Sequence, residues 1–377
     1  MALGHRLIFN KIIQIKKMNK LIILIPILSL FLLNSCCKEK KKDILIKEDV
    51  SKNEIVLEDN ISDQKVDVLV DGKLFTSYLY TKDLSVLKKT TLYPIVSANG
   101  EIITRGFPLE PRPNERTDHP HHIGAWFNYG DVNGLDYWNN SDAISEEKKN
   151  EMGTIRHEQI IDLKSGNGKA ELSVSANWLK PDGGVLLKEN TKFIFYADDG
   201  KRIIDRIVTL TALNEPVLFK DNKEGMVAIR TARQLEHPSD KPVVLSDAHG
   251  NKTDVPVLDN TGVTGHYLSS EGLEGTNVWG KRAKWVALSG TINDKDVTVA
   301  IMDEPNNIGY PTYWHARGYG LFAANALGQK IFSDGKEELN FLLEPKAAVT
   351  FKYRIEVLDG KANKEQLESE YNNFVNK

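Results

Sequence analysis

The sequence predicts an all-β protein, a two-sheet β-sandwich or larger supersandwich of the galactose-mutarotase type, that ends in a short helix. Short runs rich in Val, Ile, Phe and Tyr recur between turn residues, and helical periodicity is scarce until the C-terminus. No internal repeat and no Gly-Ser linker interrupts residues 60–360. Because many strands with few helices favour packed sheets, we expect one folded domain over residues 61–377.

The N-terminus carries the pattern of a bacterial lipoprotein signal. A largely apolar run of 13 residues, Leu21 to Leu33, follows Lys20 and leads into the lipobox-like Asn34-Ser35-Cys36. The run is shorter than the roughly 20 residues that a helix needs to cross a bilayer. We expect residues 1–35 to be a signal peptide, with Met18 as the more usual start.

Cys36 is the expected lipidated residue, and Cys37 is the only other cysteine of the chain. No disulfide framework is therefore expected within the folded domain. A lipid anchor at Cys36 predicts a protein attached to the bacterial outer membrane and facing the periplasm, with the charged residues 36–60 as a linker. The alternative is a plain secretory signal followed by a free cysteine.

The charge balance argues against a nucleic-acid partner. The formal charge of the chain is −3, and residues 1–35 contain five basic residues and no acidic one. The mature chain therefore has a formal charge of about −8, whereas nucleic acids are bound through an excess of Lys and Arg. An anionic ligand would have to be held by a few local arginines.

Two β-hairpins are predicted where strand-like runs flank an Asp-Gly pair. Asp-Gly favours the positive φ angles of tight hairpin turns. The runs and turns are 66–70 and 74–80 around Asp71-Gly72, and 192–196 and 202–210 around Asp199-Gly200.

The C-terminal segment predicts a strand followed by a helix. Apolar and polar residues alternate from Val349 to Val357, so one face of this strand is expected to be buried and the other solvated. Leu367, Tyr371 and Phe374 then form an apolar stripe at helical spacing.

Residues 119–138, HPHHIGAWFNYGDVNGLDYW, form the densest cluster of chemically active side chains. His119, His121 and His122 are three of only nine histidines in the chain. Imidazole exchanges a proton near neutral pH and is the commonest metal ligand, and the flat face of Trp126 suits a sugar ring. We predict a functional site with the histidines as catalytic residues and Trp126 in substrate binding. The alternative is a polar loop with unrelated histidines.

A second candidate pair is Glu224 and Arg230, in KEGMVAIR. Because the two residues are six positions apart, an extended strand would place both on one face. We assign both to substrate binding, with a cross-strand surface ion pair as the alternative.

A third segment, NNIGYPTYWHAR, brings Trp314, His315 and Arg317 close to Tyr319. In an extended strand His315, Arg317 and Tyr319 would share a face. A buried arginine needs a partner, so core packing does not explain this row. We assign His315 and Tyr319 to catalysis, and Trp314 and Arg317 to substrate binding.

Arginines before the histidines form a fourth cluster. Arg105, Arg112 and Arg116 lead directly into Asp118-His119. They would form an anion-binding rim, with Arg105 as a substrate-binding residue. Solvated loop arginines are the alternative.

The sequence does not require a cofactor, although it leaves a divalent metal ion open. In an extended segment His119 and His121 face together and His122 faces away, so the three cannot chelate one ion without a turn. Two of them could bind a metal with Glu224 or His315 as the third ligand.

Four motifs in order, over about residues 65–358, resemble the methane-oxygenase-like (PmoA-like) domain family. They are DHPHHIGAWFNYGDVNGLDYW, KEGMVAIR, GKRAKWVALSG and DEPNNIGYPTYWHARGYGLFAAN. Ile123 departs from the His-His-Arg-Gly more usual in that family. The resemblance implies the β-supersandwich of sugar mutarotases and polysaccharide lyases, in lipoproteins of polysaccharide-degrading bacteria, and suggests dehydratases acting on oligosaccharides such as those of ulvan. The oxygenase activity itself is set aside, because the membrane oxygenase is an integral membrane protein.

These residue types suit elimination from a uronic acid within an oligosaccharide substrate. The C5 proton becomes acidic when Arg317 or Arg230 neutralises the neighbouring carboxylate. A base with a pKa near neutral pH removes the proton, and a phenol or imidazole protonates the oxygen that leaves C4. The candidate bases are His119, His122 and His315, and the candidate acids are Tyr319 and His121.

The leaving group decides the enzyme class. Loss of a sugar would make the protein a polysaccharide lyase, and loss of water from a non-reducing end would make it an oligosaccharide dehydratase; both leave a 4,5-unsaturated uronate. A periplasmic lipoprotein meets imported oligosaccharides, which favours the dehydratase. A glycoside hydrolase using Asp131, Asp136 or Glu224 is one alternative, and a non-catalytic sugar-binding lipoprotein is another.

The anchor is tested by Cys36→Ala, which should release the protein from the membrane fraction without changing the folded domain. Fractionation after cell breakage measures the release, and Cys37→Ala is the matched control. A wild-type protein already free in the periplasm would contradict the lipobox interpretation.

Overall fold

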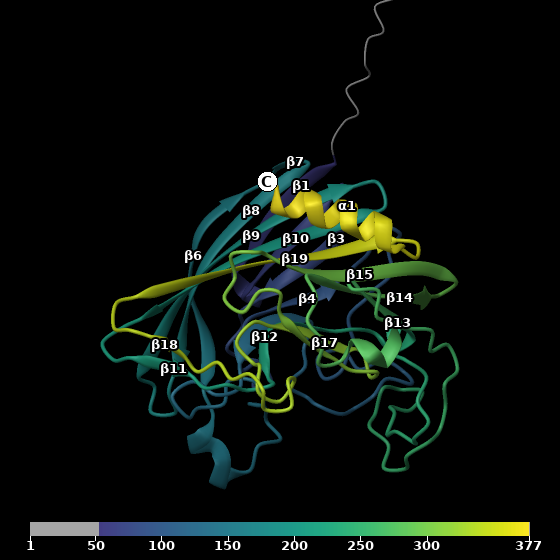
Figure 1. Ribbon diagram of the computed structural model, residues 1–377. Helices are drawn as coiled ribbons and strands as arrows, with labels where there is room; N and C mark the ends of the chain where they lie inside the picture. Colours follow the sequence, from purple (N-terminus) through teal and green to yellow (C-terminus); the bar gives the residue numbers. More distant parts are fainter. Residues whose placement is uncertain (1–52, 377) are drawn as a thin grey trace, which may run out of the picture. The chain divides into compact units, whose positions relative to one another are not determined.

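The computed structural model describes residues 53–376, which form two large antiparallel sheets packed into a β-sandwich (Figure 1). One sheet has nine strands in the order β16-β17-β12-β5-β4-β3-β2-β1-β7, and the other has eight in the order β13-β14-β15-β19-β10-β9-β8-β6. A small third sheet pairs β11 with β18. The predicted fold class, a two-sheet β-sandwich with a short C-terminal helix, is confirmed.

The strands of the nine-stranded sheet are β1 (Glu54–Asn60), β2 (Lys65–Val70), β3 (Lys73–Leu79), β4 (Thr91–Ile95), β5 (Ala125–Tyr129), β7 (Gly166–Asn167), β12 (Gly225–Arg230), β16 (Tyr313–Ala316) and β17 (Leu321–Asn325). Those of the eight-stranded sheet are β6 (Thr154–Lys164), β8 (Lys169–Leu179), β9 (Val185–Asp198), β10 (Lys201–Ala212), β13 (His266–Ser269), β14 (Trp285–Ile292), β15 (Lys295–Asp303) and β19 (Ala348–Asp359). The remaining elements are β11 (Val217–Phe219), β18 (Phe341–Leu343), α1 (Lys364–Val375) and the 3-10 helices η1 (Ile61–Asp63), η2 (Glu146–Glu151), η3 (Arg233–Leu235) and η4 (Gly275–Val278).

Both predicted hairpins are present. Asp71-Gly72 joins β2 to β3, and Asp199-Gly200 joins β9 to β10 with Asp198 paired to Lys201. Alternate residues of these strands point into one core between the sheets. Ring contacts bridge the sheets, with Phe75 6.1 Å from Phe195.

The strand β1 corrects the predicted linker, residues 36–60. Residues Glu54–Asn60 form a full strand that pairs with β2, and Ile55 and Leu57 are buried in the core. The alternating pattern of this short run was hidden among charged residues. The other expectations for this region, a signal peptide over residues 1–35 and lipidation at Cys36, lie outside the described residues. Among residues 53–376, no helix is long and apolar enough to span a membrane.

The outer face of the last strand is exposed in its first half, as predicted, but is covered in its second half. Phe351, Tyr353 and Ile355 face the core as predicted, but Arg354 and Glu356 on the other face are also buried. The helix α1 lies across this outer face (Figure 1), and Arg354 forms a bidentate ion pair with Asp205 beneath it, at 2.6 and 2.8 Å. The predicted helical stripe explains the cover, because Leu367, Tyr371 and Phe374 pack against the sheet.

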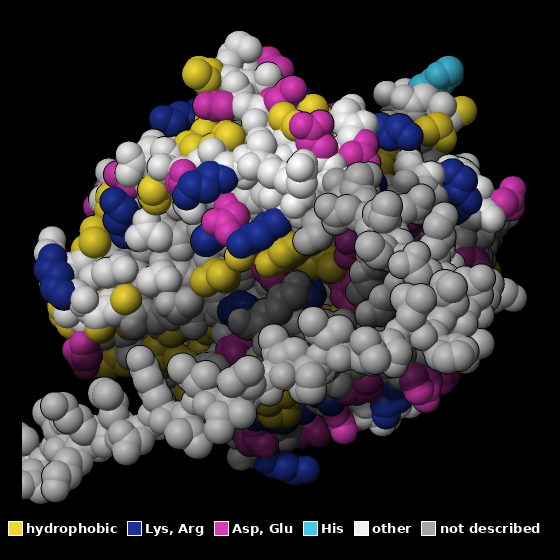
Figure 2. Space-filling view, turned by 90° about the horizontal axis from the view of Figure 1, so that it is seen from above, with side chains coloured by type: hydrophobic (Ala, Val, Ile, Leu, Met, Phe, Trp, Pro, Cys, Tyr) yellow, Lys and Arg dark blue, Asp and Glu magenta, His cyan; other side chains and the backbone are white. Residues whose placement is uncertain are grey.

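Charges of both signs are mixed on the face shown in Figure 2. Lys and Arg side chains there lie among Asp and Glu and form no continuous basic patch.

Replacing Leu367 with alanine should destabilise the domain by about 2–5 kcal/mol, because its side chain is fully buried on the face of α1 that packs against the sheet. Urea unfolding followed by circular dichroism measures the change. Ser369→Ala, on the exposed side of the same helix, should change stability by less than about 0.5 kcal/mol. Equal effects of the two substitutions would show that α1 does not stabilise the sandwich.

Candidate functional site

The candidate site lies on the outer face of the nine-stranded sheet, where β5, β12, β17 and β16 are neighbours. Strand alternation decides which side chains reach this face. The cross-strand pairs Trp126 with Ala228 and His315 with Ala323 lie there, whereas Trp314 belongs to the sandwich core. The small alanine side chains leave room above the sheet for the rings of other residues.

A cavity of about 250 Å³ opens on this face. It is enclosed by a turn that carries the three histidines, by the residues that precede β12, and by the hairpin between β16 and β17. The lining residues are His119, His121, His122, Trp138, Asn139, Lys223, Glu224, His315, Arg317, Tyr319 and Leu321. Seven of the eleven predicted catalytic and substrate-binding residues line the cavity, and the other four are buried beside or beneath it.

A larger cavity of about 520 Å³ lies between loops elsewhere on the domain. Its charged side chains already have protein partners: Glu101 pairs with Lys295, Arg112 with Glu115, and Arg233 with a backbone carbonyl. The smaller cavity is the candidate site because it collects imidazole nitrogens without partners.

His119, His121 and His122 lie on a tight turn rather than on the extended segment considered above. His119 adopts a left-handed backbone conformation with φ of +44°, and the amide of His122 donates to the carbonyl of His119 at 2.9 Å. The ring of His122 is 4.8 Å from that of His119 and 4.3 Å from that of His121. The turn therefore directs all three rings into the cavity.

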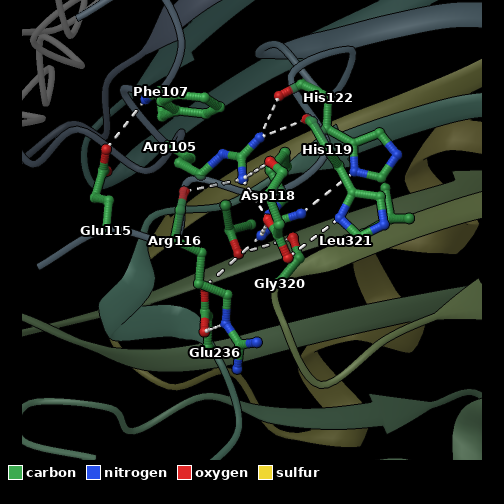
Figure 3. Close-up of polar contacts among 12 residues, drawn as sticks. Arg105, Phe107, Glu115, Arg116, Asp118, His119, His122, Glu236, Gly320 and Leu321 are labelled. Atoms are coloured by element: carbon green, nitrogen blue, oxygen red, sulfur yellow. Dashed lines mark hydrogen bonds and ion pairs between the residues drawn. The ribbon is translucent and has the colours of Figure 1, made fainter. Parts of the chain in front are cut away.

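Arg105 holds this turn from beneath and does not line the cavity, contrary to the substrate-binding position predicted for it. Its side chain is buried, and it donates to the carbonyls of His119 and His122 at 2.9 and 3.1 Å (Figure 3). It also pairs with the carboxylate of Asp118 at 2.8 Å. Burial and the nearby Arg230 guanidinium lower the pKa of Arg105 to about 9. No pattern in the sequence indicated that these carbonyls would face inward.

Lys89 and Thr91 complete the support of the turn. Buried Lys89 donates to the carbonyl of His121 at 2.7 Å, and the hydroxyl of Thr91 donates to the carbonyl of Ile123 at 2.6 Å. Burial lowers the pKa of Lys89 to about 7. Ile123 itself is buried, so the site contains no side chain from this position.

The predicted anion-binding rim is also absent, because its arginines pair with protein groups. Arg116 pairs with buried Glu236 at 2.6 Å, and Arg112 pairs with Glu115 at 2.8 Å. Both pairs hold the loop that leads into the histidine turn, and Figure 3 shows the pair of Arg116 with Glu236. Burial raises the pKa of Glu236 even though two arginines oppose the shift.

Arg230 lies behind the cavity wall with its side chain fully buried. It pairs with Asp118 at 2.8 Å, and its guanidinium lies 4.7 Å from the ring centre of Tyr319. Its Nη1 is 3.3 Å from Nδ1 of His122. Since a guanidinium only donates, Nδ1 accepts and the proton of His122 sits on Nε2, a buried atom with no partner among the described residues.

Arg317 and Tyr319 lie in the turn of a hairpin, since β16 ends at Ala316. Arg317 and Tyr319 were predicted on one strand face with His315 but lie in a turn instead. Both side chains still line the cavity with His315. The ring of Tyr319 stacks on that of His119 at 5.2 Å. Gly320 permits the turn, with φ of +78°, where a Cβ would lie 2.6 Å from Oγ1 of Thr231.

His315 faces Glu224 across the cavity, with Nδ1 and Oε2 3.4 Å apart. Glu224 also contacts Lys223. Burial lowers the pKa of His315 to about 3, aided by Lys223 and Arg317, and burial lowers that of His121 to about 2. These histidines are therefore neutral at physiological pH.

Trp126 and Trp314 are not accessible to a substrate, contrary to their predicted binding role. Both side chains are fully buried; Trp126 lies under the ring of His122 at 5.3 Å, and Trp314 donates to a core carbonyl. Their position in the strands explains this, because β5 is covered by the histidine turn and Trp314 points to the core. Trp138 lines the cavity instead.

Within the part of the chain that the structure describes, no group of three or more His, Cys, Asp or Glu side chains is arranged to hold a metal ion. Buried Arg105 and Arg230 lie next to the histidine turn. Their positive charges oppose a cation at this position.

Sequence reasoning missed several residues that build the site. Lys89 and Asp118 support the histidine turn, and Lys223 and Asn139 line the cavity. Asp118 and Lys223 are direct neighbours of predicted residues, so their positions could have been flagged. Lys89 is 30 residues upstream of His119 and carried no signal.

Comparison with solved structures gives distant similarities only. The chain is 11% identical to the GH36 α-galactosidase AgaB from Geobacillus stearothermophilus (TM-score 0.38), covering 81% of this chain and 41% of that chain. It is 10% identical to the α-galactosidase from Lactobacillus brevis (TM-score 0.39; 84% and 41%) and to a galactose mutarotase-like protein from Clostridium acetobutylicum (TM-score 0.35; 82% and 99%). The chain thus spans less than half the length of either galactosidase.

Comparison with curated proteins found no match. The model of one family covers residues 65–372, which include all of the cavity-lining residues. The chain belongs to that family, which is described as a family of unknown function (DUF6807).

Proposed function

We propose that the protein is a carbon–oxygen lyase that removes water from the non-reducing-end uronic acid of an oligosaccharide and leaves a 4,5-unsaturated uronate. The observation that supports this most is the set of groups in one cavity. Two cations, Arg317 and Lys223, lie with neutral imidazoles and the phenol of Tyr319. Elimination next to a carboxylate uses a cation, a base and an acid together.

Arg317 is the proposed carboxylate-binding residue. Its Nε is buried and has no partner among the described residues, and its guanidinium lies 5.3 Å from the ring centre of Trp279. Lys223 is half-buried, and burial together with the charge of Arg317 lowers its pKa. An anion bound between these two cations would relieve their mutual repulsion. Arg230, the other candidate, is occupied by Asp118 and His122.

His119 is the proposed base and Tyr319 the proposed acid. His119 is the most accessible of the three histidines in the turn, and its ring stacks directly on that of Tyr319. Burial raises the pKa of Tyr319, so the phenol keeps its proton at neutral pH and can donate it. His119 would take the C5 proton, the C5–H electrons would form the C4–C5 double bond, and the C4 hydroxyl would leave as water with a proton from Tyr319.

The size of the cavity favours an exo-acting dehydratase over an endo-acting lyase. Its volume of about 250 Å³ is slightly below the usual range for ligand sites, roughly 300–1,000 Å³. One sugar ring fits such a space, whereas an endo-lyase needs an open groove for sugars on both sides of the bond. A lipid anchor at Cys36 would place this activity where imported oligosaccharides arrive.

A glycoside hydrolase is less well supported, because it needs two carboxylates beside one bond. Glu224 lines the cavity, but Asp131 and Asp136 do not. Asp136 instead accepts from Asn139 and from two backbone amides, and Asp131 accepts from the amide of Gly134. A sugar-binding lipoprotein without activity would have little use for histidines held as neutral bases.

Incubation with uronate-terminated oligosaccharides should produce new ultraviolet absorbance from the conjugated product, and mass spectrometry should show loss of one water. Gain of one water without absorbance would indicate the hydrolase. Binding by calorimetry without any product would indicate the sugar-binding protein. Either of these two outcomes overturns the proposed dehydratase.

Replacing Arg317 with alanine should lower kcat by about 10²–10³-fold and raise KM, because the charge that Arg317 offsets grows as the C5 proton leaves. Steady-state kinetics on the active oligosaccharide measure both constants. Arg202→Ala, on β10 and outside the cavity, is the matched control and should change neither. Unchanged kcat in Arg317→Ala would rule out its role at the carboxylate.

A further inference from the structure

We infer that Asp118 is a positioning residue that fixes the tautomer of His119 and so decides which ring nitrogen faces the substrate. This inference rests on the proposed role of His119 as the base, although its geometric part can be tested without any substrate. Asp118 precedes the histidine motif directly and does not line the cavity.

The contact joins Oδ2 of Asp118 to Nδ1 of His119 at 3.2 Å (Figure 3). The contact does not have hydrogen-bond geometry as it stands, and Nδ1 has no hydrogen-bond partner among the described residues. Hydrogen bonds of catalytic groups are often long before substrate binds. Because a carboxylate only accepts, the proton of His119 must sit on Nδ1, which leaves the lone pair of Nε2 free to remove a proton.

Asp118 remains a carboxylate because two buried arginines hold it. Its Oδ1 accepts from Arg105 and from Arg230, at 2.8 Å each. Although burial opposes ionisation, these guanidiniums and His119 hold the pKa of Asp118 well below its usual range. Arg105 also donates to two carbonyls of the turn, and Arg230 to His122, so the carboxylate cannot shift without disturbing several contacts.

The surroundings of His119 fix the plane of its ring but not its proton. The ring is stacked between those of His122 and Tyr319, at 4.8 and 5.2 Å, and the left-handed backbone directs it into the cavity. Stacking does not discriminate between Nδ1 and Nε2, so Asp118 provides the discrimination. The titratable groups in contact with the ring are Asp118, His121, His122 and Tyr319.

The tautomer is measured on the wild-type protein by nitrogen NMR of 15N-histidine-labelled samples, with His119 assigned by its loss in His119→Gln. The expected result is a protonated Nδ1 and an unprotonated Nε2 above pH 7. A protonated Nε2, or equal populations of the two tautomers, would overturn the inference whatever the activity of the protein. This measurement needs no variant of Asp118 and no substrate.

Kinetics test the consequence for catalysis. Asp118→Asn should lower kcat by about 10²–10⁴-fold with KM little changed, because the ring of His119 loses the carboxylate that holds its proton on Nδ1. Asp118→Glu should restore part of the activity. Glu274→Gln, which alters an exposed carboxylate 3.2 Å from His266, is the matched control and should change none of these values.

The two hypotheses fail in distinguishable ways. A correct tautomer with no elimination on any uronate substrate would contradict the proposed function alone. Elimination that persists at full rate in a folded Asp118→Asn protein would contradict the positioning role alone.

Discussion

The candidate site depends on two buried arginines that share one carboxylate. Arg105 and Arg230 both donate to Asp118, and Arg105 also holds two carbonyls of the histidine turn. Buried guanidiniums are costly unless each is paired and hydrogen-bonded, so their partners cannot move independently. The turn is thereby fixed in a conformation that the backbone of His119 would not favour alone.

The same burial determines the protonation of the site. The rings of His121, His122 and His315 lose water contact, and burial is the largest cause of their lowered pKa values. The positive charges beside them act in the same direction. A cluster of neutral imidazoles beside the cations Arg317 and Lys223 is suited to an anionic substrate that carries an acidic C–H bond, which is the chemistry proposed here.

The sandwich provides the platform for this arrangement. Four neighbouring strands, β5, β12, β17 and β16, present one face to the core and one to the cavity. The small side chains of Ala228 and Ala323 leave space over the outer face of the sheet. The rings of Trp126, Trp138 and His122 pack in this space. The side chains proposed to act on a ligand, His119, Arg317 and Tyr319, then come from turns, which the sheet holds at fixed spacing.

The sequence by itself determined the fold class, the two Asp-Gly hairpins, the C-terminal helix and most of the cavity-lining residues. Periodicity of two or about 3.6 residues and turn chemistry are local properties, and His119, His315 and Tyr319 stood out because their side chains are reactive. β1 was missed because charged neighbours obscured its alternation.

Only the tertiary structure decided which of the predicted residues face the cavity and which support it. Arg105, Trp126, Arg230 and Trp314 have the same residue types as binding side chains, but strand direction and the cover of the histidine turn bury them. Lys89 and Asp118 acquire their roles from contacts with turn carbonyls and with arginines distant in sequence. Burial and long-range pairing are properties of the packed chain, and no local pattern in the sequence specifies them.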